Sequence, residues 1–222
     1  MVKPVGFSAF LKLLQLSEVQ RKAELKKKLG GGGGFQYWRP VQLVAPKAVL
    51  PGANIEALKQ ELASLCSGHQ QKYNKNAFEA FSKWINGKTI TPIEPLPMME
   101  VPFGNFGLVV RLRPDLSFLH GDLACSMTLW ATTKPTLTTE TLSVALFFMA
   151  AAYKAKGHKG QEHLILDTVS NRLFREVDIL PSAIHLLKDK VDAFKNDWSE
   201  LTPTPPASSD LPKGDQPTLP KQ

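Results

Sequence analysis

Aromatic and cationic side chains gather in one short segment near the N-terminus. Phe35, Tyr37, Trp38 and Arg39 place three rings and a guanidinium group within five residues. Rings of this kind stack on unpaired nucleobases at about 1–3 kcal/mol per base, while Lys and Arg attract phosphates in a salt-sensitive way. The segment therefore indicates nucleic-acid binding. The alternative is a plug of rings that packs the segment into the core, and for Tyr37 and Trp38 we favour the plug.

Lysines precede this segment on a predicted helix over residues 17–28. Glu18 with Lys22, and Glu24 with Lys28, are acid-before-base pairs four residues apart, a spacing that supports a helix. The last turn is rich in lysine, which the helix dipole favours. The candidate residues for contact with nucleic acid or with an acidic protein partner are Lys22, Lys26, Lys27, Lys28, Arg39 and Trp38.

The net charge of +7 has the same location. Residues 1–47 hold nine Lys or Arg against two acids, whereas the rest of the chain holds eighteen of each sign. A basic surface over the whole protein is thus excluded, and we assign the charge to a helical arm over residues 1–34. The glycine run Gly30–Gly34 is expected to be a hinge. It does not resemble a phosphate-binding loop, because a helix precedes it and no Lys-Ser or Lys-Thr closes it.

Acidic residues suggest a second, enzymatic interpretation. The predicted order of helix, three strands, helix and strand matches the αβββαβ core of metal-dependent nucleases of the PD-(D/E)XK type, as a fold-level analogy. Asp115 or Asp122 would be the first ligand of a divalent cation, with Glu100 and Asp167 as further acids. The predicted third strand reads Ala-Cys-Ser-Met-Thr-Leu-Trp, without the acid and lysine that these enzymes need. The analogy therefore predicts a degenerate site.

Other catalytic patterns are missing from the sequence. There is no Gly-x-Ser-x-Gly motif, and neither Cys66 nor Cys125 has a histidine nearby in a known nucleophile pattern. His158 and His163 are five residues apart across a loop, not on one helical face as a metalloprotease requires, so we interpret them as surface histidines. We therefore expect no catalytic residue, no metal ligand and no cofactor.

Periodicity predicts an α+β fold. A helix at 7–16 precedes the helix at 17–28, and two more are expected at 54–67 and 76–85, separated by a polar loop over 69–76. Prolines make 89–105 an extended connector or an edge strand. The remaining elements are an antiparallel meander of strands at 108–112, 116–119 and 123–130, a buried helix at 140–156, strands at 163–167 and 173–177, and a C-terminal helix after Pro181 that docks on the sheet.

Domain organisation and function follow from these elements. We expect a basic arm at 1–34, a single α+β domain at 35–201 and a disordered proline-rich tail at 202–222. No apolar stretch reaches the roughly 20 residues of a membrane-spanning helix, no secretory signal is recognised, and two cysteines fit a reducing compartment such as the cytoplasm. The sequence predicts a non-enzymatic intracellular binding or adaptor protein. The alternatives are the metal-dependent hydrolase and, as a minor option, a membrane-surface protein anchored by the helix at 7–16.

Overall fold

A five-stranded mixed sheet and a smaller three-stranded sheet organise the protein. The structure is a computed structural model that describes residues 4–30 and 37–202. Within this part of the chain, the strand orders are β2-β5-β6-β7-β8 and β1-β4-β3. The strands are β1 (Val5–Gly6), β2 (Ile90–Pro92), β3 (Met99–Pro102), β4 (Val109–Leu112), β5 (Leu116–His120), β6 (Leu123–Trp130), β7 (Gln161–Asp167) and β8 (Arg172–Arg175). The predicted α+β class is confirmed.

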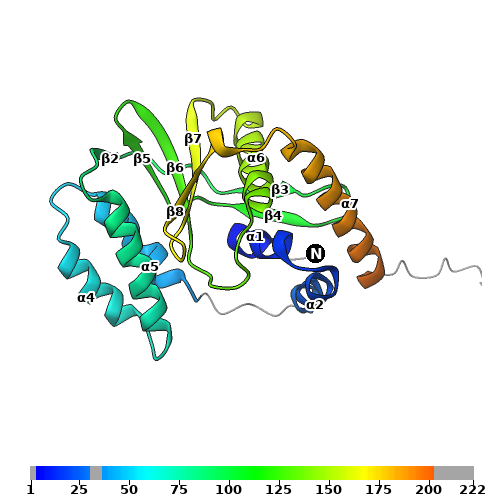
Figure 1. Cartoon of the computed structure of the whole chain (residues 1–222), viewed down its shortest axis with the longest axis horizontal. Helices are drawn as coiled ribbons and strands as arrows, with labels where there is room; N and C mark the ends of the chain where they lie inside the picture. The colour runs from blue at the N-terminus through cyan, green and yellow to red at the C-terminus, as the bar shows by residue number, and fades with distance from the viewer. Residues whose placement is uncertain (1–3, 31–36, 203–222) are drawn as a thin grey trace, which may run out of the picture.

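Helices flank the large sheet on both sides (Figure 1). They are α1 (Phe7–Gln15), α2 (Glu18–Leu29), α3 (Arg39–Val44), α4 (Ile55–Leu65), α5 (Gln70–Ile85), α6 (Thr139–Ala155) and α7 (Ala183–Leu201), with short 3-10 helices at Ala45–Val49 and Glu176–Asp178. None of the helices in the described ranges is long and apolar enough to cross a membrane.

The large sheet is buried on both faces because apolar residues occupy both sides of its strands. In β6, Cys125, Met127 and Leu129 pack with Phe78, Phe81 and Phe118 in one core under α3–α5. Trp130 packs on the opposite face in a second core shared with α1, α6, α7 and the small sheet. Alternate residues of a strand point to opposite faces, so one strand contributes to both cores. We call these the α5 core and the α6 core.

The large sheet has the pattern of the predicted core, with one different strand. Strands β2, β5 and β6 are antiparallel neighbours in the sheet, although β3 and β4 lie between β2 and β5 in the chain. Helix α6 then crosses over, and β7 pairs in parallel with β6. Together with the preceding α5, and without the two strands of the small sheet that lie between β2 and β5, this gives the order αβββαβ. Strand β8 then adds antiparallel to β7.

The members of the antiparallel set differ from the predicted meander. The strand expected at 108–112 exists as β4, but it pairs with β3 and β1 in the small sheet and not with β5. The strand that pairs with β5 in its place is β2, which lies at the start of the proline-rich stretch 89–105. Alternation along the sequence shows that a segment is a strand, but the neighbour of that strand depends on side-chain packing and on the connecting residues.

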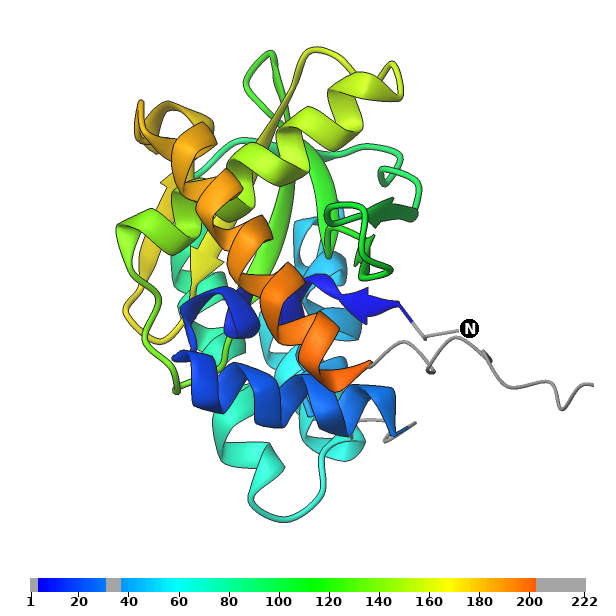
Figure 2. The same ribbon diagram turned by 90° about the vertical axis from the view of Figure 1, so that its right-hand side faces the viewer.

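Residues 4–30 belong to the folded body. Strand β1 pairs with β4, and Phe7, Phe10, Leu11 and Leu14 of α1 are buried in the α6 core. Helix α2 lies beside α7 (Figure 2). The described part of the predicted arm is therefore integrated, because an apolar stripe of this size is buried against α6 and α7. The division at residue 34 stays a prediction, since the hinge at 31–34 and the tail at 203–222 lie outside the described residues.

Candidate nucleic-acid interface

The loop formed by residues 131–138 contributes to the lining of two surface hollows. This loop leaves the carboxyl end of β6, where β6 and β7 run in parallel. The first hollow, about 290 Å³ in volume, is lined by Tyr37, Trp38, His69, Tyr73, Thr132 and Thr133, and we call it the aromatic hollow. The second, about 530 Å³ in volume, is lined by Lys12, Leu16, Gln20, Ala23, Glu24, Lys134 and Pro135, and we call it the lysine hollow.

Four rings meet edge to face in the aromatic hollow. The ring centre of Tyr37 lies 4.8 Å from that of Trp38, 5.3 Å from that of His69 and 6.2 Å from that of Tyr73. Trp38 and His69 also approach Tyr73, at 6.4 and 5.8 Å. Edge-to-face packing holds rings in defined orientations. The tyrosine and tryptophan side chains are partly exposed and His69 is exposed, so the cluster faces solvent.

Buried amides of α5 hold the backbone that carries these rings. Gln70 Nε2 and Asn74 Nδ2 donate to the carbonyl oxygen of Tyr37, at 2.7 and 3.0 Å. The Oδ1 atom of Asn74 accepts a hydrogen bond from the amide of Val41 at 3.1 Å. Both amide side chains are buried, so their hydrogen bonds are needed to offset the loss of water. These hydrogen bonds fix the segment that contains Tyr37 and Trp38 against α5.

These amides also explain why α5 begins earlier than predicted. The sequence predicted a loop over 69–76 because that stretch is polar, and this prediction is wrong, since α5 starts at Gln70. The side chains buried in its first two turns are amides, which hydrogen-bond to the backbone, and not apolar side chains. A hydrophobic pattern cannot register such contacts.

Trp38 has features of both the core plug and the binding surface that the sequence suggested for the aromatic segment. Its ring packs against the α5 core, as the plug interpretation predicts, yet it also lines the aromatic hollow. Its Nε1 atom donates to Thr132 Oγ1 at 3.0 Å, which ties the ring to the loop after β6. The Tyr37 hydroxyl donates to the carbonyl of His69 at 3.3 Å, and burial raises the pKa of this phenol. No negative charge arises there that would repel a phosphate.

Exposed cations are neighbours in sequence of residues that line the aromatic hollow. Lys72 lies one turn after His69 on α5, and Lys134 follows Thr133 directly in the loop. Both are exposed, and neither forms an ion pair with any residue in the described ranges. Arg39, the first residue of α3, is exposed beside Trp38. Rings and cations thus occur together at this edge of the sheet.

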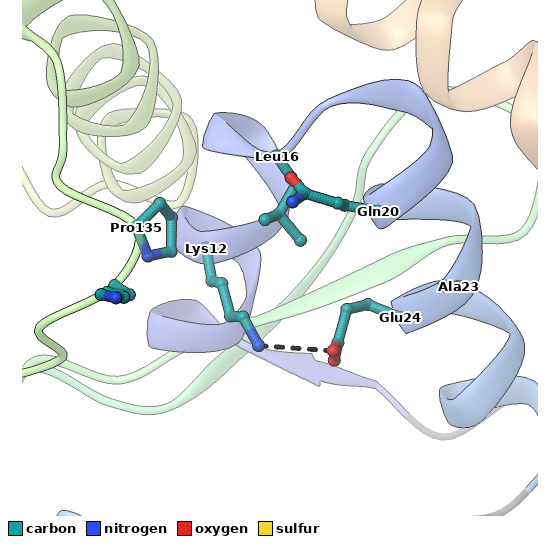
Figure 3. A pocket seen from close by; sticks show the side chains of 7 residues that line it. Lys12, Leu16, Gln20, Ala23, Glu24 and Pro135 are labelled. Carbon is teal, nitrogen blue, oxygen red and sulfur yellow. Dashed lines mark ion pairs between the residues drawn. The ribbon is translucent and has the colours of Figure 1, made fainter.

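In the lysine hollow, a single carboxylate faces two ammonium groups. Glu24 Oε1 lies 3.4 Å from Lys12 Nζ and 3.1 Å from Lys27 Nζ, and the first pair is drawn in Figure 3. Partial burial of Glu24 opposes its ionisation, but Lys27 and Lys12 hold its pKa below the usual value. The hollow therefore contains fixed charges of both signs.

The candidate residues identified in the sequence separate into two groups. Trp38 lies in the aromatic hollow, Arg39 lies beside it, and Lys27 contacts Glu24 at the lysine hollow. Lys22 instead points to α7, where its Nζ lies 2.7 Å from Glu200 Oε2 and also 2.6 Å from Glu18 Oε1. Hydrogen bonds to these carboxylates raise its pKa, so Lys22 stays protonated and its positive charge is compensated by Glu18 and Glu200.

Lys26 and Lys28 occupy the last turn of α2. Lys26 is exposed and Lys28 partly so, and neither pairs with an acid among the described residues. The sequence did not indicate His69, Lys72, Tyr73, Thr132 or Lys134, although the run from His69 to Asn76 is visibly polar and basic. Only the fold brings α5 and the loop after β6 to Trp38.

The acids of the hydrolase interpretation lie apart. Asp115 and Asp122 stand at opposite ends of the β5–β6 hairpin, roughly 17 Å apart at about 3.3 Å per residue. Glu100 pairs with Arg111 in the small sheet, and Asp167 accepts hydrogen bonds from the amides of Val169 and Ser170. No group of three or more metal-ligating side chains converges anywhere in residues 4–30 and 37–202.

Asp115 nevertheless has an unusual environment. Its Oδ2 atom accepts a hydrogen bond from the amide of Leu129 at 2.7 Å, and burial raises its pKa to about 7. It lies opposite Thr128 in the hairpin register, and the Thr128 hydroxyl is buried without a partner among the described residues. In the nuclease analogy, β6 is the strand that would supply a metal ligand and a lysine. At this position it has the hydroxyl of Thr128 instead.

The interpretation of His163 as a surface residue is wrong. His163 is buried under α6, where Ser126 Oγ lies 2.6 Å from its Nδ1 and the ring stacks on Tyr153 at 5.1 Å. Burial lowers its pKa to about 4, so the imidazole is neutral at physiological pH. Its position in β7, directly before the buried run from Leu164 to Leu166, is what places it inside. Because the pair with Ser126 is enclosed, no substrate reaches it.

A comparison of the sequence with protein-family models and with curated proteins finds no match.

Proposed function

We propose that this protein is a non-enzymatic binding protein whose ligand is single-stranded nucleic acid. The observation that carries the proposal is the aromatic hollow, in which Trp38, Tyr37, Tyr73 and His69 are held in fixed orientations at the surface. Unpaired bases stack on such rings with little dependence on sequence. A cytoplasmic location belongs to the same proposal, supported by the free thiols of Cys66 and Cys125.

The charges around the hollow support a nucleic acid rather than an acidic peptide. Lys72, Arg39 and Lys134 are exposed and adjoin Tyr73, Trp38 and Thr133 in the sequence, so they supply positive charge near the hollow, which fits a ligand that carries both flat bases and phosphates. An acidic peptide would require the lysines without the rings. A double helix keeps its bases stacked internally, so a ligand with unpaired bases uses the hollow best.

The test is the affinity of a fluorescent, unstructured oligonucleotide about twelve nucleotides long, a length within the usual site size. Tyr73→Leu should weaken binding about 5- to 150-fold, which corresponds to the 1–3 kcal/mol of one stacked base. The matched control is Phe106→Leu, because Phe106 is a partly exposed ring that packs on Trp198, on α7. Equal affinities for both variants and the natural protein would refute the proposal.

The hydrolase alternative is tested separately by thermal unfolding with Mg²⁺ or Mn²⁺. A bound ion stabilises the folded state by mass action, and the stabilisation should disappear in Asp115→Ala if Asp115 is a ligand. Binding of the oligonucleotide without any shift by either ion favours the binding protein over the hydrolase.

A further inference from the structure

We infer that the lysine hollow receives a backbone phosphate of the same nucleic-acid strand, and that Glu24 competes with this phosphate for Lys12 and Lys27. The inference rests on the proposed function and adds a second site with its own ligand chemistry. It also assigns Glu24 as a residue that limits affinity.

The two hollows are adjacent along one loop. Thr133 lines the aromatic hollow and Lys134 lines the lysine hollow, and consecutive Cα atoms are about 3.8 Å apart. A strand whose bases stack on Tyr73 and Trp38 therefore passes over the loop with its next phosphates at Lys134. The walls of the lysine hollow come from α1 and α2, as Figure 3 shows for Lys12, Gln20 and Glu24.

Charge favours an anion in the lysine hollow. Lys12 and Lys134 line the hollow together with one carboxylate, that of Glu24, and Lys27 pairs with the same carboxylate from the rim. A phosphate oxygen makes the same charge-assisted hydrogen bonds as the Glu24 carboxylate. The side chains of Lys12 and Glu24 are 37% and 27% exposed, and an ion pair so open to solvent contributes little to stability. Its exchange for a phosphate is therefore inexpensive.

Glu24 opposes the approaching strand in two ways. It occupies the ammonium groups of Lys12 and Lys27, and it repels the phosphates directly. Removing its charge should therefore strengthen binding, whereas removing a lysine charge should weaken it. Glu18 lies on the same helix, and its carboxylate pairs with Lys22 away from the hollow, so it provides a matched control.

The experiment measures the affinity of an oligonucleotide of about twelve nucleotides and of one of about three, which fits the aromatic hollow alone. For the longer strand, Glu24→Gln should tighten binding several-fold, and Lys12→Gln and Lys134→Gln should each weaken it several-fold with a salt slope lower by about 0.7. Glu18→Gln should change neither strand's affinity, and Glu24→Gln and Lys12→Gln should not alter binding of the short strand. Thermal unfolding confirms that each variant is folded.

The outcomes separate the inference from the proposed function. If Tyr73→Leu weakens binding but Glu24→Gln does not tighten it, the aromatic hollow binds nucleic acid and the inference is wrong. Equal tightening by Glu18→Gln would also overturn it, because the effect would then be one of net charge. If no strand binds the natural protein, both the proposed function and the inference fail.

Discussion

Arg21 and Asp197 form an ion pair that is almost completely buried between α2 and α7. Their side chains are 7% and 2% exposed, and the guanidinium also lies 5.0 Å from the ring centre of Phe194. Two charges removed from water in this way depend on each other, because either one alone is an uncompensated buried charge. The pair therefore fixes α2 against α7.

Asp197→Ala should destabilise the protein by about 3–5 kcal/mol, since it leaves the Arg21 guanidinium buried without its partner. Asp192→Ala, at an exposed position of the same helix, is the control and should change stability by less than about 0.5 kcal/mol. Urea unfolding measures both. Similar midpoints for the two variants would show that α2 is not held by this pair.

Two buried groups should give opposite pH dependences of stability. His163 has a pKa of about 4 when folded and 6.5 when unfolded, so the unfolded chain binds more protons and stability falls as pH decreases from 6.5 to 4. Asp115 has a pKa of about 7 when folded and 3.8 when unfolded, so the folded protein holds the extra proton. Its effect is that stability falls as pH rises from 3.8 to 7.

Single substitutions should therefore tilt the pH profile in opposite directions. In Asp115→Asn, the effect of His163 is no longer opposed. As pH increases from about 4.5 to 6.5, the free energy of unfolding of this variant should rise by about 1–2 kcal/mol relative to that of the natural protein. His163→Asn should tilt the profile the other way by a similar amount. Urea titrations at the two pH values test this, and parallel profiles for all three proteins would contradict it.

At the scale of elements, α1 shows why residues 4–30 are not an appendage. The ring of Phe10 is fully buried and meets Phe103 at 4.8 Å and Phe148 at 5.4 Å. A basic, glycine-bounded segment predicted an arm, but the apolar stripe of α1 is a stronger determinant than the charges of α2. The apolar stripe of α1 is visible in the sequence. The residues that it packs against, Phe103 directly after β3 and Phe148 in α6, are not.

Phe10→Ala should cost about 3–5 kcal/mol of stability, the usual loss for a buried ring. Val19→Ala is the control, because Val19 on α2 is 80% exposed. Differential scanning calorimetry should show a much lower midpoint for Phe10→Ala and an almost unchanged one for Val19→Ala. A natural-like midpoint for Phe10→Ala would mean that α1 detaches from the body, as an arm would.

The sequence predicted the α+β class and most helices because their apolar stripes are long and regular. It located α6 within about a residue of its bounds, from the Thr138 cap and the apolar run that follows. It missed the start of α5, where buried Gln70 and Asn74 bind backbone, and it assigned β4 to the wrong sheet. Contacts made by polar groups, and pairings between distant strands, leave no periodic trace in a sequence.

The candidate site was predictable in part for the same reason. Trp38 and Arg39 were visible as a cluster because they are consecutive. Tyr73 and Thr132 join them only because α5 and the loop after β6 meet at that edge of the sheet. Lys22 was misleading, since its acidic partner Glu200 is far away in the sequence.

At the scale of the whole molecule, the positive charge of the described residues up to position 47 is distributed over a folded surface. Part of it is neutralised against α7, and part of it lies at the lysine hollow and near the aromatic hollow. Because α1 contributes to the α6 core, deleting the first 34 residues would damage the fold as well as the charge. Charge-neutralising substitutions in the full chain are the appropriate way to examine binding.

The most direct test of the central claim is the salt dependence of the affinity for a single-stranded oligonucleotide, measured for the natural chain and for Tyr73→Leu. If the aromatic hollow binds bases, Tyr73→Leu should lose about 5- to 150-fold in affinity at every salt concentration while the slope of log affinity against log salt stays the same. An affinity unaffected by Tyr73→Leu, or no measurable binding by the natural chain at low salt, would contradict the claim.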